Sequence, residues 1–576
     1  MEIAVNPSVP TYAGGLGVLA GDTLRAAADL DVPLVAVTLL HRRGYFHQRL
    51  DAGGHQTEEP VAWPVDDFLE PLTQRVAVEI ENRVVQVRAW RFQMTGVSGF
   101  HIPIYFLDTD LPDNSPWDRR LTDSLYGGDE HYRLCQEAVL GLGGVRMLRA
   151  LGHRSVTRFH LNEGHAALLI LALLEERLAS HPDSSLATGI KAVSGQCVFT
   201  THTPVPAGHD QFARDMVRRV LGEELWKRLQ ACGQDTVLNM TDLALRCSRY
   251  VNGVAIRHGE VSRSLFPGYP IHSITNGVHA ATWAAPSFEA LYDRRLPAWR
   301  QDALSLRFAQ NISGNEIWEA HRAAKHVLVD AVNHAANAGF DRDVLTLGFA
   351  RRATAYKRAM LVFHDLERLE AIVRRAGALQ LVFAGKAHPL DHEGKEIIRS
   401  VHAMRVRLRG RIAVAYLPNY DMALAKVLCA GVDVWLNTPL PPHEASGTSG
   451  MKAAVNGVPS LSVLDGWWIE GHVEGVTGWA IGGDGETAAA PDPAMDARHA
   501  ASLYEKLDAQ VLPCFYRQRE GFIEMMRRTI ALNASFFNTH RMVRQYVHLA
   551  YAATPPSDTA ASGAGERAGL EGDTRK

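Results

Sequence analysis

The sequence has 576 residues, of which 46% are hydrophobic and 21% are charged, and its formal net charge is −3. A chain of this length exceeds what one hydrophobic core usually serves, so we expect two or three domains with a ligand-binding cleft between them. The small net charge excludes a general attraction to nucleic acid or to an anionic membrane, so any positive site must be local.

Cysteine spacing and apolar runs indicate the compartment. The six cysteines are scattered without a CxxC pair or a zinc-type spacing, which favours reduced thiols and a cytoplasmic protein. The N-terminus does not resemble a signal peptide, and no run of about 18 apolar residues predicts a membrane span.

The first half of the chain repeats an order of loop, helix and strand. Residues 21–30 have helical composition and precede an apolar strand predicted at 31–40. A second strand is predicted at 156–161, before a long helix, and the same pattern recurs in the stretch QCVFTTHTPVPAGHDQF, residues 196–212. Polar residues at the ends of such strands are typical of α/β enzymes.

The second half contains five short β-rich runs separated by helical segments, which predicts a doubly wound parallel sheet with its active loops at the carboxyl ends of the strands. These runs are residues 343–350, 379–387, 411–418, 432–439 and 458–465, and 357–377 is the clearest helical segment. We expect one domain over 1–283, a second over 284–552, and a disordered tail over 553–576.

A glycine-rich turn and a cationic cluster are candidate ligand sites. Gly14, Gly15 and Gly17 precede a predicted helix, where backbone N–H groups could approach an anion, although a tight turn alone would also need glycine. After the strand at 343–350 come four cations, Arg351, Arg352, Lys357 and Arg358. Charge runs are usually solvated, but this one ends a parallel strand, so phosphate binding is the favoured interpretation.

Histidines near strand ends have a structural and a functional interpretation. His202, Asn162, Glu163 and His165 follow two of the predicted strands, yet a lone histidine is more often a packed residue than a ligand. No HExxH or comparable set predicts a metal site. The stretch AGKAHP around Lys386 lacks the first glycine and the Ser or Thr of a Walker sequence, so we reject a nucleotide triphosphatase.

Lys452 ends the loop HEASGTSGMK, just where the chain becomes apolar. A lysine in such a place must lose its charge, pair with an anion, or be modified, and a Schiff base with an aldehyde cofactor meets that need. The alternative is a lysine near a helix N-terminus that snorkels to water, and the loop taken alone favours it.

Six motifs in this order resemble the α-glucan phosphorylase family, in its short prokaryotic type. They are GGLGVLAGD, THT, ITNGVH, RRATAYKR, AGKAHP and EASGTSGMK, and the resemblance covers residues 2–530. It implies a GT-B architecture of two Rossmann-like domains facing across a deep cleft, with the C-terminal helices crossing back to the first domain. It also implies reversible phosphorolysis of α-1,4-glucan non-reducing ends to α-D-glucose 1-phosphate with retention.

The resemblance assigns roles to matching positions. Lys452 is similar to the lysine that binds pyridoxal 5′-phosphate covalently, Lys357 to the one that reaches the cofactor phosphate, and Arg352 to the arginine that grips substrate phosphate. Further cofactor contacts are implied for Arg351, Tyr420, Gly447 and Thr448. Substrate contacts are implied for Gly14, Gly15, Leu16, His202, Asn276, Glu444, Ala445 and Ser446.

Two positions depart from the family pattern. Met1 and Glu2 begin inside a motif that follows a strand in the family, so we expect upstream sequence and a site residue at Glu2. Asp421 follows Tyr420 where animal members carry an arginine near the cofactor phosphate.

The implied partners are α-1,4-glucan (glycogen, starch or maltodextrin) and inorganic phosphate, with a homodimer and no nucleic acid, membrane or metal. The alternatives are a nucleotide-sugar glucosyltransferase of the glycogen-synthase type and an inactive glucan-binding protein. An aminotransferase-like pyridoxal enzyme fits less well, because its acidic and arginine partners cannot be placed in this chain.

Overall fold

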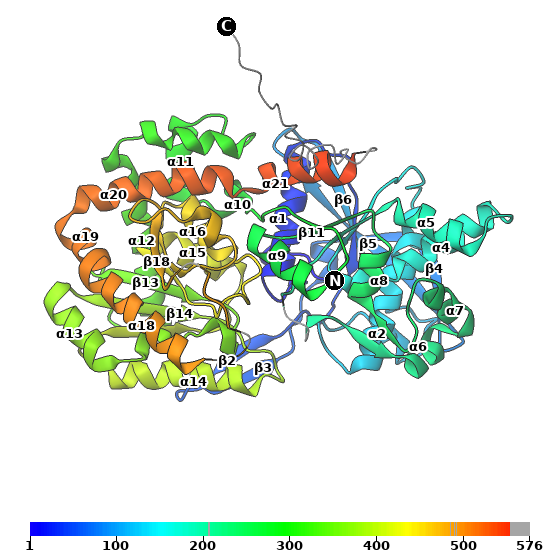
Figure 1. Cartoon of the computed structure of the whole chain (residues 1–576), viewed down its shortest axis with the longest axis horizontal. Coiled ribbons are helices and arrows are strands. Elements are labelled where there is room, and N and C mark those ends of the chain that lie inside the picture. The colour runs from blue at the N-terminus through cyan, green and yellow to red at the C-terminus, as the bar shows by residue number, and fades with distance from the viewer. Residues whose placement is uncertain (205–207, 484, 489, 491, 553–576) are drawn as a thin grey trace, which may run out of the picture.

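The computed structural model describes residues 1–204, 208–483, 485–488, 490 and 492–552. The tail predicted at 553–576 lies outside these residues. The first part of the chain and the second lie side by side along the long axis, with the last helices between them (Figure 1). No helix within the described ranges has the length and hydropathy needed to cross a membrane.

The first part holds two four-stranded sheets. One has the order β1-β6-β5-β4, in which only β1 and β6 are parallel. Its strands are β1 (Ala36–Leu39), β4 (Glu70–Ile80), β5 (Arg83–Thr95) and β6 (His101–Asp108). The other is parallel with the order β12-β11-β8-β7. Its strands are β7 (Phe159–Asn162), β8 (Cys197–Thr200), β11 (Tyr250–Gly253) and β12 (Ile271–Ser273).

The strands predicted at 31–40 and 156–161 are therefore present as β1 and β7 with shifted ends, and β8 lies within the predicted stretch 196–212. The long antiparallel strands β4 and β5 escaped prediction because much of each is exposed or half-buried, so neither forms a continuous apolar run. Helices surround both sheets, namely α1 (Gly15–Asp29), α2 (Glu130–Ala138), α3 (Gly144–Ala150), α4 (Leu169–Ser180), α5 (Leu186–Ser194), α6 (Arg214–Leu221), α7 (Glu223–Ala231), α8 (Met240–Arg246) and α9 (Ile256–Leu265). A short ribbon pairs β9 (Gln211–Ala213) with β10 (Val237–Asn239).

The second part confirms the predicted parallel sheet, with the order β15-β14-β13-β16-β17-β18. Its strands are β13 (Leu345–Ala350), β14 (Leu379–Ala384), β15 (Ala413–Leu417), β16 (Val434–Asn437), β17 (Ser460–Val463) and β18 (Gly478–Ile481). Five match the predicted runs, and β18 was missed. Nearly every strand residue is buried, as expected for a sheet covered by helices on both faces.

The helices of the second part are α10 (Ala280–Trp283), α11 (Pro286–Arg295), α12 (Gly314–Ala336), α13 (Leu366–Ala376), α14 (His392–Arg407), α15 (Met422–Gly431), α16 (Ser449–Val455), α17 (Trp468–Gly471), α18 (Pro493–Lys506), α19 (Leu512–Arg517), α20 (Arg519–Arg528) and α21 (Thr539–Gln545). The helical segment predicted at 357–377 is confirmed only in its second half, as α13. Arg358 has a left-handed backbone with φ 49°, and α13 starts only where Asp365 caps the amide of Arg368.

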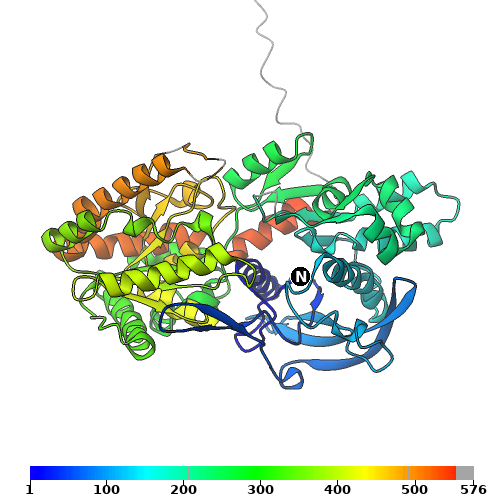
Figure 2. The same cartoon turned by 90° about the horizontal axis from the view of Figure 1, so that it is seen from below.

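A hairpin from the first part lies against the second part (Figure 2). It pairs β2 (His47–Leu50) with β3 (Gln56–Glu59). The amide of Gln48 donates to Asn419 Oδ1 at 3.1 Å, and its side-chain Nε2 donates to the carbonyl of Gly385 at 3.0 Å. Lys386 Nζ donates to the carbonyl of Phe46 at 2.9 Å. The motif AGKAHP thus joins the two parts of the chain.

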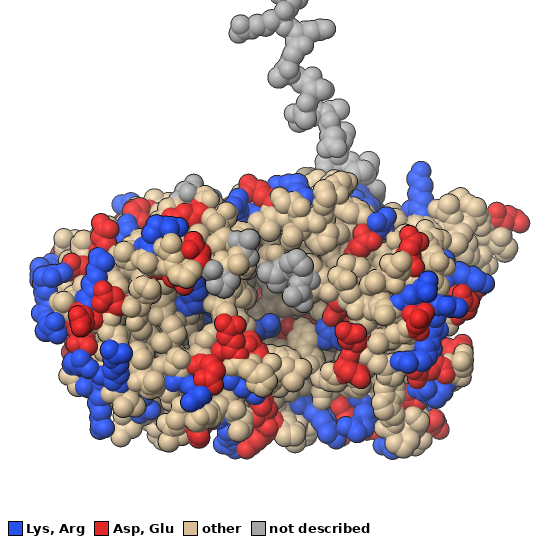
Figure 3. Space-filling model, turned by 60° about the horizontal axis from the view of Figure 1, so that its bottom comes forward, with Lys and Arg blue, Asp and Glu red and all other residues tan. Residues whose placement is uncertain are grey.

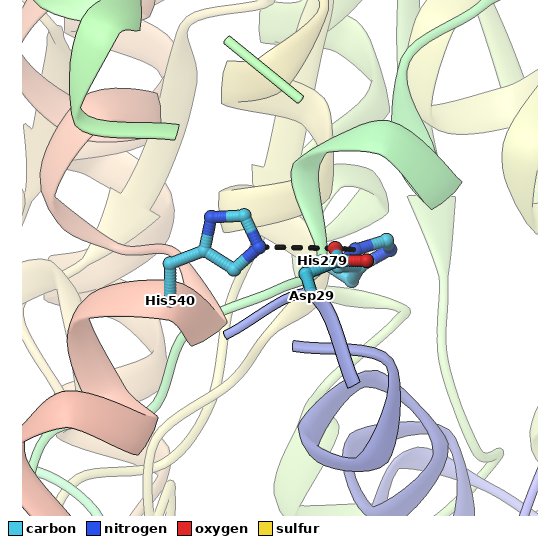
Figure 4. A group of neighbouring side chains, drawn as sticks. All are labelled: Asp29, His279 and His540. Atoms are coloured by element: carbon cyan, nitrogen blue, oxygen red, sulfur yellow. Dashed lines mark hydrogen bonds and ion pairs between the residues drawn. The ribbon is translucent and has the colours of Figure 1, made fainter. Parts of the chain in front are cut away.

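The last helices return to the first part, where α21 packs on α1. Asp29, at the end of α1, accepts hydrogen bonds from His279 Nε2 at 2.7 Å and from His540 Nε2 at 3.1 Å (Figure 4). Three ligand atoms this close could hold a metal. The amide of Ala303 donates to His540 Nδ1, however, which leaves the ring proton on Nε2, directed at Asp29. The group therefore acts as a buried hydrogen-bonded link between distant segments.

Candidate active site

The cations predicted after β13 separate in the structure. Arg351 is buried and donates to Asn437 Oδ1, at the end of β16, and to Glu444 Oε2. Lys357 Nζ donates to the same carboxylate oxygen at 2.7 Å. Because β13 and β16 are neighbours, their carboxyl ends bring these side chains together. Arg358 leaves the cluster, since it pairs with Asp496 at 2.7 Å.

Glu444 is an ionised carboxylate between two buried cations. Burial alone would raise its pKa, but Arg351 and Lys357 together lower the pKa of Glu444 to about 2. Its amide donates to Asp465 Oδ2 at 2.8 Å. Burial raises the pKa of Asp465 to about 7, and the neighbouring charge of Glu444 adds to that rise. Glu444 therefore remains an anion at neutral pH and fixes the two cations in place.

Arg352 faces the glycine-rich turn of the first part. Its side chain is exposed, and a Cβ added at Gly14 would lie 3.5 Å from its Nη2. The molecular surface between the two parts is hollowed, with basic and acidic side chains in and around the hollow (Figure 3). Helix α1 starts at Gly15, and Gly14 provides no side-chain cap, so the first-turn amides of Gly15 and Leu16 remain available to an anion.

Glu2 forms hydrogen bonds that stabilise the conformation of this turn. Its Oε2 accepts hydrogen bonds from the amides of Ala13 at 2.6 Å and Gly14 at 3.2 Å. Its Oε1 accepts one from the hydroxyl of Tyr126 at 2.9 Å. Glu2 is 2% exposed. The structure therefore places Glu2 where it positions the turn.

Lys452 is buried within α16, so the snorkelling alternative is wrong. Its ammonium nitrogen lies 4.2 Å from the centre of the Trp283 ring, and burial lowers the pKa of Lys452 below its usual value. Trp283 is in turn held by its Nε1, which donates to Asp22 of α1 at 2.6 Å. Such a lysine is a reactive amine, because desolvation disfavours its charged form.

Two polar atoms near the predicted sugar-binding positions are buried without a partner in the described part of the chain. They are Ser446 Oγ and Asn276 Oδ1. Ser446 belongs to the loop that also carries Ala445, Gly447 and Thr448. Gly447 has φ 80°, which requires glycine. Unpartnered buried polar atoms are unfavourable unless a ligand or water satisfies them, so these two atoms could accept a partner from a bound ligand.

His202 is fixed by its neighbours at the end of β8. Its Nε2 lies 2.6 Å from Asn162 Oδ1, and its amide donates to Glu163 Oε2 at 2.8 Å. Burial lowers the pKa of His202 to about 3, so the ring is neutral at pH 7. His165 points elsewhere: its Nδ1 lies 3.1 Å from Asp210, in a group that already contains the cation of Arg133.

Tyr420 is half-buried, and burial raises its pKa well above the usual value. The adjacent Asp421 caps α15, where its Oδ1 accepts from the amide of Leu424 at 2.8 Å. The amide of Met422 donates to the hydroxyl of Tyr12, which belongs to the glycine-rich turn. Asp421 therefore has a structural role at the helix start, which accounts for the departure at this position.

Sequence reasoning missed Asn437, Asp465 and Trp283. Asn437 and Asp465 each stand at or just after the end of a parallel strand, so the strand-end rule applied to β16 and β17 would have found them. Trp283 gave no such signal, because its contact with Lys452 joins residues of distant segments.

Comparisons with known proteins agree with the motif order. A family model described as carbohydrate phosphorylase matches residues 209–476. Maltodextrin phosphorylase of Thermococcus litoralis is 39% identical, over 96% of this chain and 70% of its own. Glycogen phosphorylase of Mycobacterium tuberculosis is 38% identical, over 98% of this chain and 71% of its own. Glycogen phosphorylase of Aquifex aeolicus is 35% identical, over 96% and 85% respectively.

Proposed function

The chain belongs to the carbohydrate phosphorylase family, and from that membership we propose the reaction it carries out. It is an α-glucan phosphorylase, consistent with relatives of that activity that are 35–39% identical over nearly the whole chain. We propose reversible phosphorolysis of the non-reducing ends of α-1,4-glucans, which releases α-D-glucose 1-phosphate with retained configuration. The substrates are then a glucan and inorganic phosphate.

The proposed architecture is GT-B, with Rossmann-like domains over 1–283 and 284–552. The parallel sheets of the two parts support it, as does the approach of Arg352, which follows β13, to Gly14 at the start of α1. Helix α21 then belongs to the second domain by sequence and to the first by packing.

Pyridoxal 5′-phosphate is the cofactor we propose, and the residues present fit it. The buried amine of Lys452, with its lowered pKa, suits covalent attachment of an aldehyde. Gly447, Thr448 and Tyr420 lie in segments adjoining α16 and β15, and the cations Arg351 and Lys357 suit a phosphate. When bound, this cofactor supplies a phosphate group whose second pKa of about 6 allows proton exchange at neutral pH.

The remaining groups would bind and orient the substrates. Arg352 and the first-turn amides of α1 would hold inorganic phosphate, which delivers its proton to the leaving glycosidic oxygen and then bonds to C1 of the sugar. Ser446 and Asn276 would satisfy sugar hydroxyls with the oxygens that otherwise lack partners. Neutral His202, whose Nε2 donates to Asn162 Oδ1, would accept a hydrogen bond from the same sugar at Nδ1.

Glu444 has a different part in this reaction from the carboxylates of glycosidases, which donate protons or attack C1. With a pKa of about 2 it cannot serve as the acid at neutral pH. It would instead keep Arg351 and Lys357 in place and accept a hydrogen bond from a sugar hydroxyl. The positive charge of this group would stabilise two phosphates held close together.

The single observation that carries the proposal is the buried amine of Lys452, whose pKa burial lowers. We expect the purified protein to absorb as a pyridoxal enzyme, and borohydride reduction to leave a pyridoxyl adduct on Lys452. The Lys452→Ala variant should lose phosphate-dependent release of glucose 1-phosphate from maltodextrin. The matched Lys227→Ala variant, at an exposed lysine paired only with Glu224 at 3.9 Å, should keep it.

Near-normal activity of Lys452→Ala would refute the assignment. Glucosyl transfer that depends on a nucleotide sugar and ignores phosphate would identify the glucosyltransferase alternative. Glucan binding without turnover in either assay would identify an inactive binding protein.

A further inference from the structure

A cavity of about 210 Å³ lies between α12 and the α19–α20 segment, near the amino end of β13. Its wall includes Arg342 and Asp343, which precede β13, whereas Arg351 follows that strand. The six residues of β13 span about 20 Å at roughly 3.3 Å per residue. The two sites are therefore separate.

The lining of the cavity contains more cationic than acidic side chains. Its cations are Arg322, Lys325, Arg342 and Arg519, and Asp343 is the carboxylate among the lining residues. Cationic N–H donors in a recess can hold an anion where a carboxylate does not already occupy them.

Three of these cations have carboxylate partners. Lys325 is buried, with Nζ 2.6 Å from Asp433 and 2.8 Å from the carbonyl of Val344. These contacts fix the position of its side chain in the cavity wall. Arg322 pairs with Glu319 at 3.2 Å and Arg342 with Asp330 at 2.8 Å, and both pairs are exposed. Exposed pairs of this kind contribute little, so both guanidinium groups are free to turn toward a bound anion.

Arg519 differs from the other three. Its guanidinium carbon lies 4.3 Å from the centre of the Trp318 ring and 4.4 Å from that of Phe515. In the part of the chain that the structure describes, the guanidinium forms no ion pair or hydrogen bond. Two rings thus hold a flat cation while its N–H donors have no acceptor, and this geometry suits a planar two-point contact with phosphate or carboxylate.

We propose that this cavity binds a small phosphate monoester, with Arg519 as the principal contact. Its volume holds about seven water molecules at roughly 30 Å³ each, which exceeds the need of a bare phosphate ion. It is also smaller than the pockets of about 300–1,000 Å³ that bind drug-sized ligands. A phosphate on a short polar carbon skeleton is the ligand class that this volume and the free N–H donors of Arg519 suit.

Isothermal titration calorimetry with glycerol 3-phosphate tests this site, with glycerol and sulfate as separate probes. We expect wild-type protein to bind glycerol 3-phosphate more tightly than either probe alone. Arg519→Gln should weaken the binding by about tenfold or more, because one charge-assisted bidentate contact is lost. The nearby exposed Arg517→Gln variant should bind as wild type does, since Arg517 is not among the residues that line the cavity and its guanidinium donates to the carbonyl of Arg375.

The Arg352→Gln variant distinguishes binding at the cavity from binding at the candidate active site. It should keep the part of the glycerol 3-phosphate affinity that depends on Arg519. The calorimetric titration measures binding and needs no turnover, so it tests the cavity even if the protein has no phosphorolytic activity. The thermal midpoint of each variant checks that it is folded, and Arg519→Lys, which retains charge without the flat fork, should bind with intermediate affinity. No binding to wild type, equal binding by Arg519→Gln, or equal loss in both Arg519→Gln and Arg517→Gln would each overturn the proposal.

Discussion

Removing the charge of Glu444 should destabilise the cofactor-free protein, because Arg351 and Lys357 would then be buried without a counter-ion. The pKa of Glu444 falls from its usual value near 4.5 to about 2 in the folded protein. A difference of that size corresponds to about 3 kcal/mol of folding free energy at roughly 1.4 kcal/mol per pKa unit. The Glu444→Gln variant keeps the shape of the side chain, so most of this loss should be electrostatic.

The sign of the pH dependence follows from the lowered pKa. The stabilisation is fully present above pH 4.5 and disappears as the pH falls through 2, since the carboxylate is then protonated in both states. Urea unfolding of cofactor-free protein, followed by fluorescence and circular dichroism, measures the difference at pH 7, 5 and 4. The gap between wild type and Glu444→Gln should be largest at pH 7 and narrow toward acid.

A matched control uses Glu396→Gln, at an exposed carboxylate that pairs with Arg399 on the same helix turn. This variant should lie within about 0.5 kcal/mol of wild type, as exposed pairs usually do. Equal stability of wild type and Glu444→Gln at pH 7, or a difference that does not change with pH, would refute the electrostatic reasoning.

Three further outcomes follow from the structure. Gly385→Ala should destabilise the protein by well over the ~1 kcal/mol expected for a backbone penalty alone, because its Cβ would approach the carbonyl oxygen of Arg351 to 1.9 Å; thermal unfolding measures the loss. Asp29→Asn should destabilise the link in Figure 4 by about 1–3 kcal/mol, and since the pKa of Asp29 is lowered in the folded state, the difference from wild type should shrink at acid pH. Arg352→Gln should raise KM for phosphate more than KM for glucan, as initial-rate kinetics would show.

Each outcome has a result that contradicts it. Gly410→Ala, at a glycine with φ 78° and open space around it, should cost only the backbone penalty, so equal losses at Gly410 and Gly385 would remove the steric argument. A pH-independent effect of Asp29→Asn would show that its charge does not matter. If Arg352→Gln changed kcat alone, Arg352 would not be a phosphate-binding residue.

The local sequence pattern was sufficient to predict most strands of the second part. The runs that became β13 to β17 are apolar along their whole length because a covered parallel sheet buries both faces of each strand. Strands β4 and β5 were missed because many of their residues are exposed or half-buried. The helical segment predicted at 357–377 is a helix only in its second half, because Arg358 adopts a left-handed backbone that the helical pattern does not signal.

The sequence by itself determined the parallel strands, the polar residues at their ends and the order of motifs that identifies the family. Only the tertiary structure decided which of these residues meet. Arg351 and Glu444 are 93 residues apart and contact each other because β13 is a neighbour of β16. The same holds for Gly14 beside Arg352 and for Trp283 over Lys452. Composition and periodicity describe each segment alone. The charge states of Glu444 and Lys452 depend instead on side chains from distant segments and on the exclusion of water by packing.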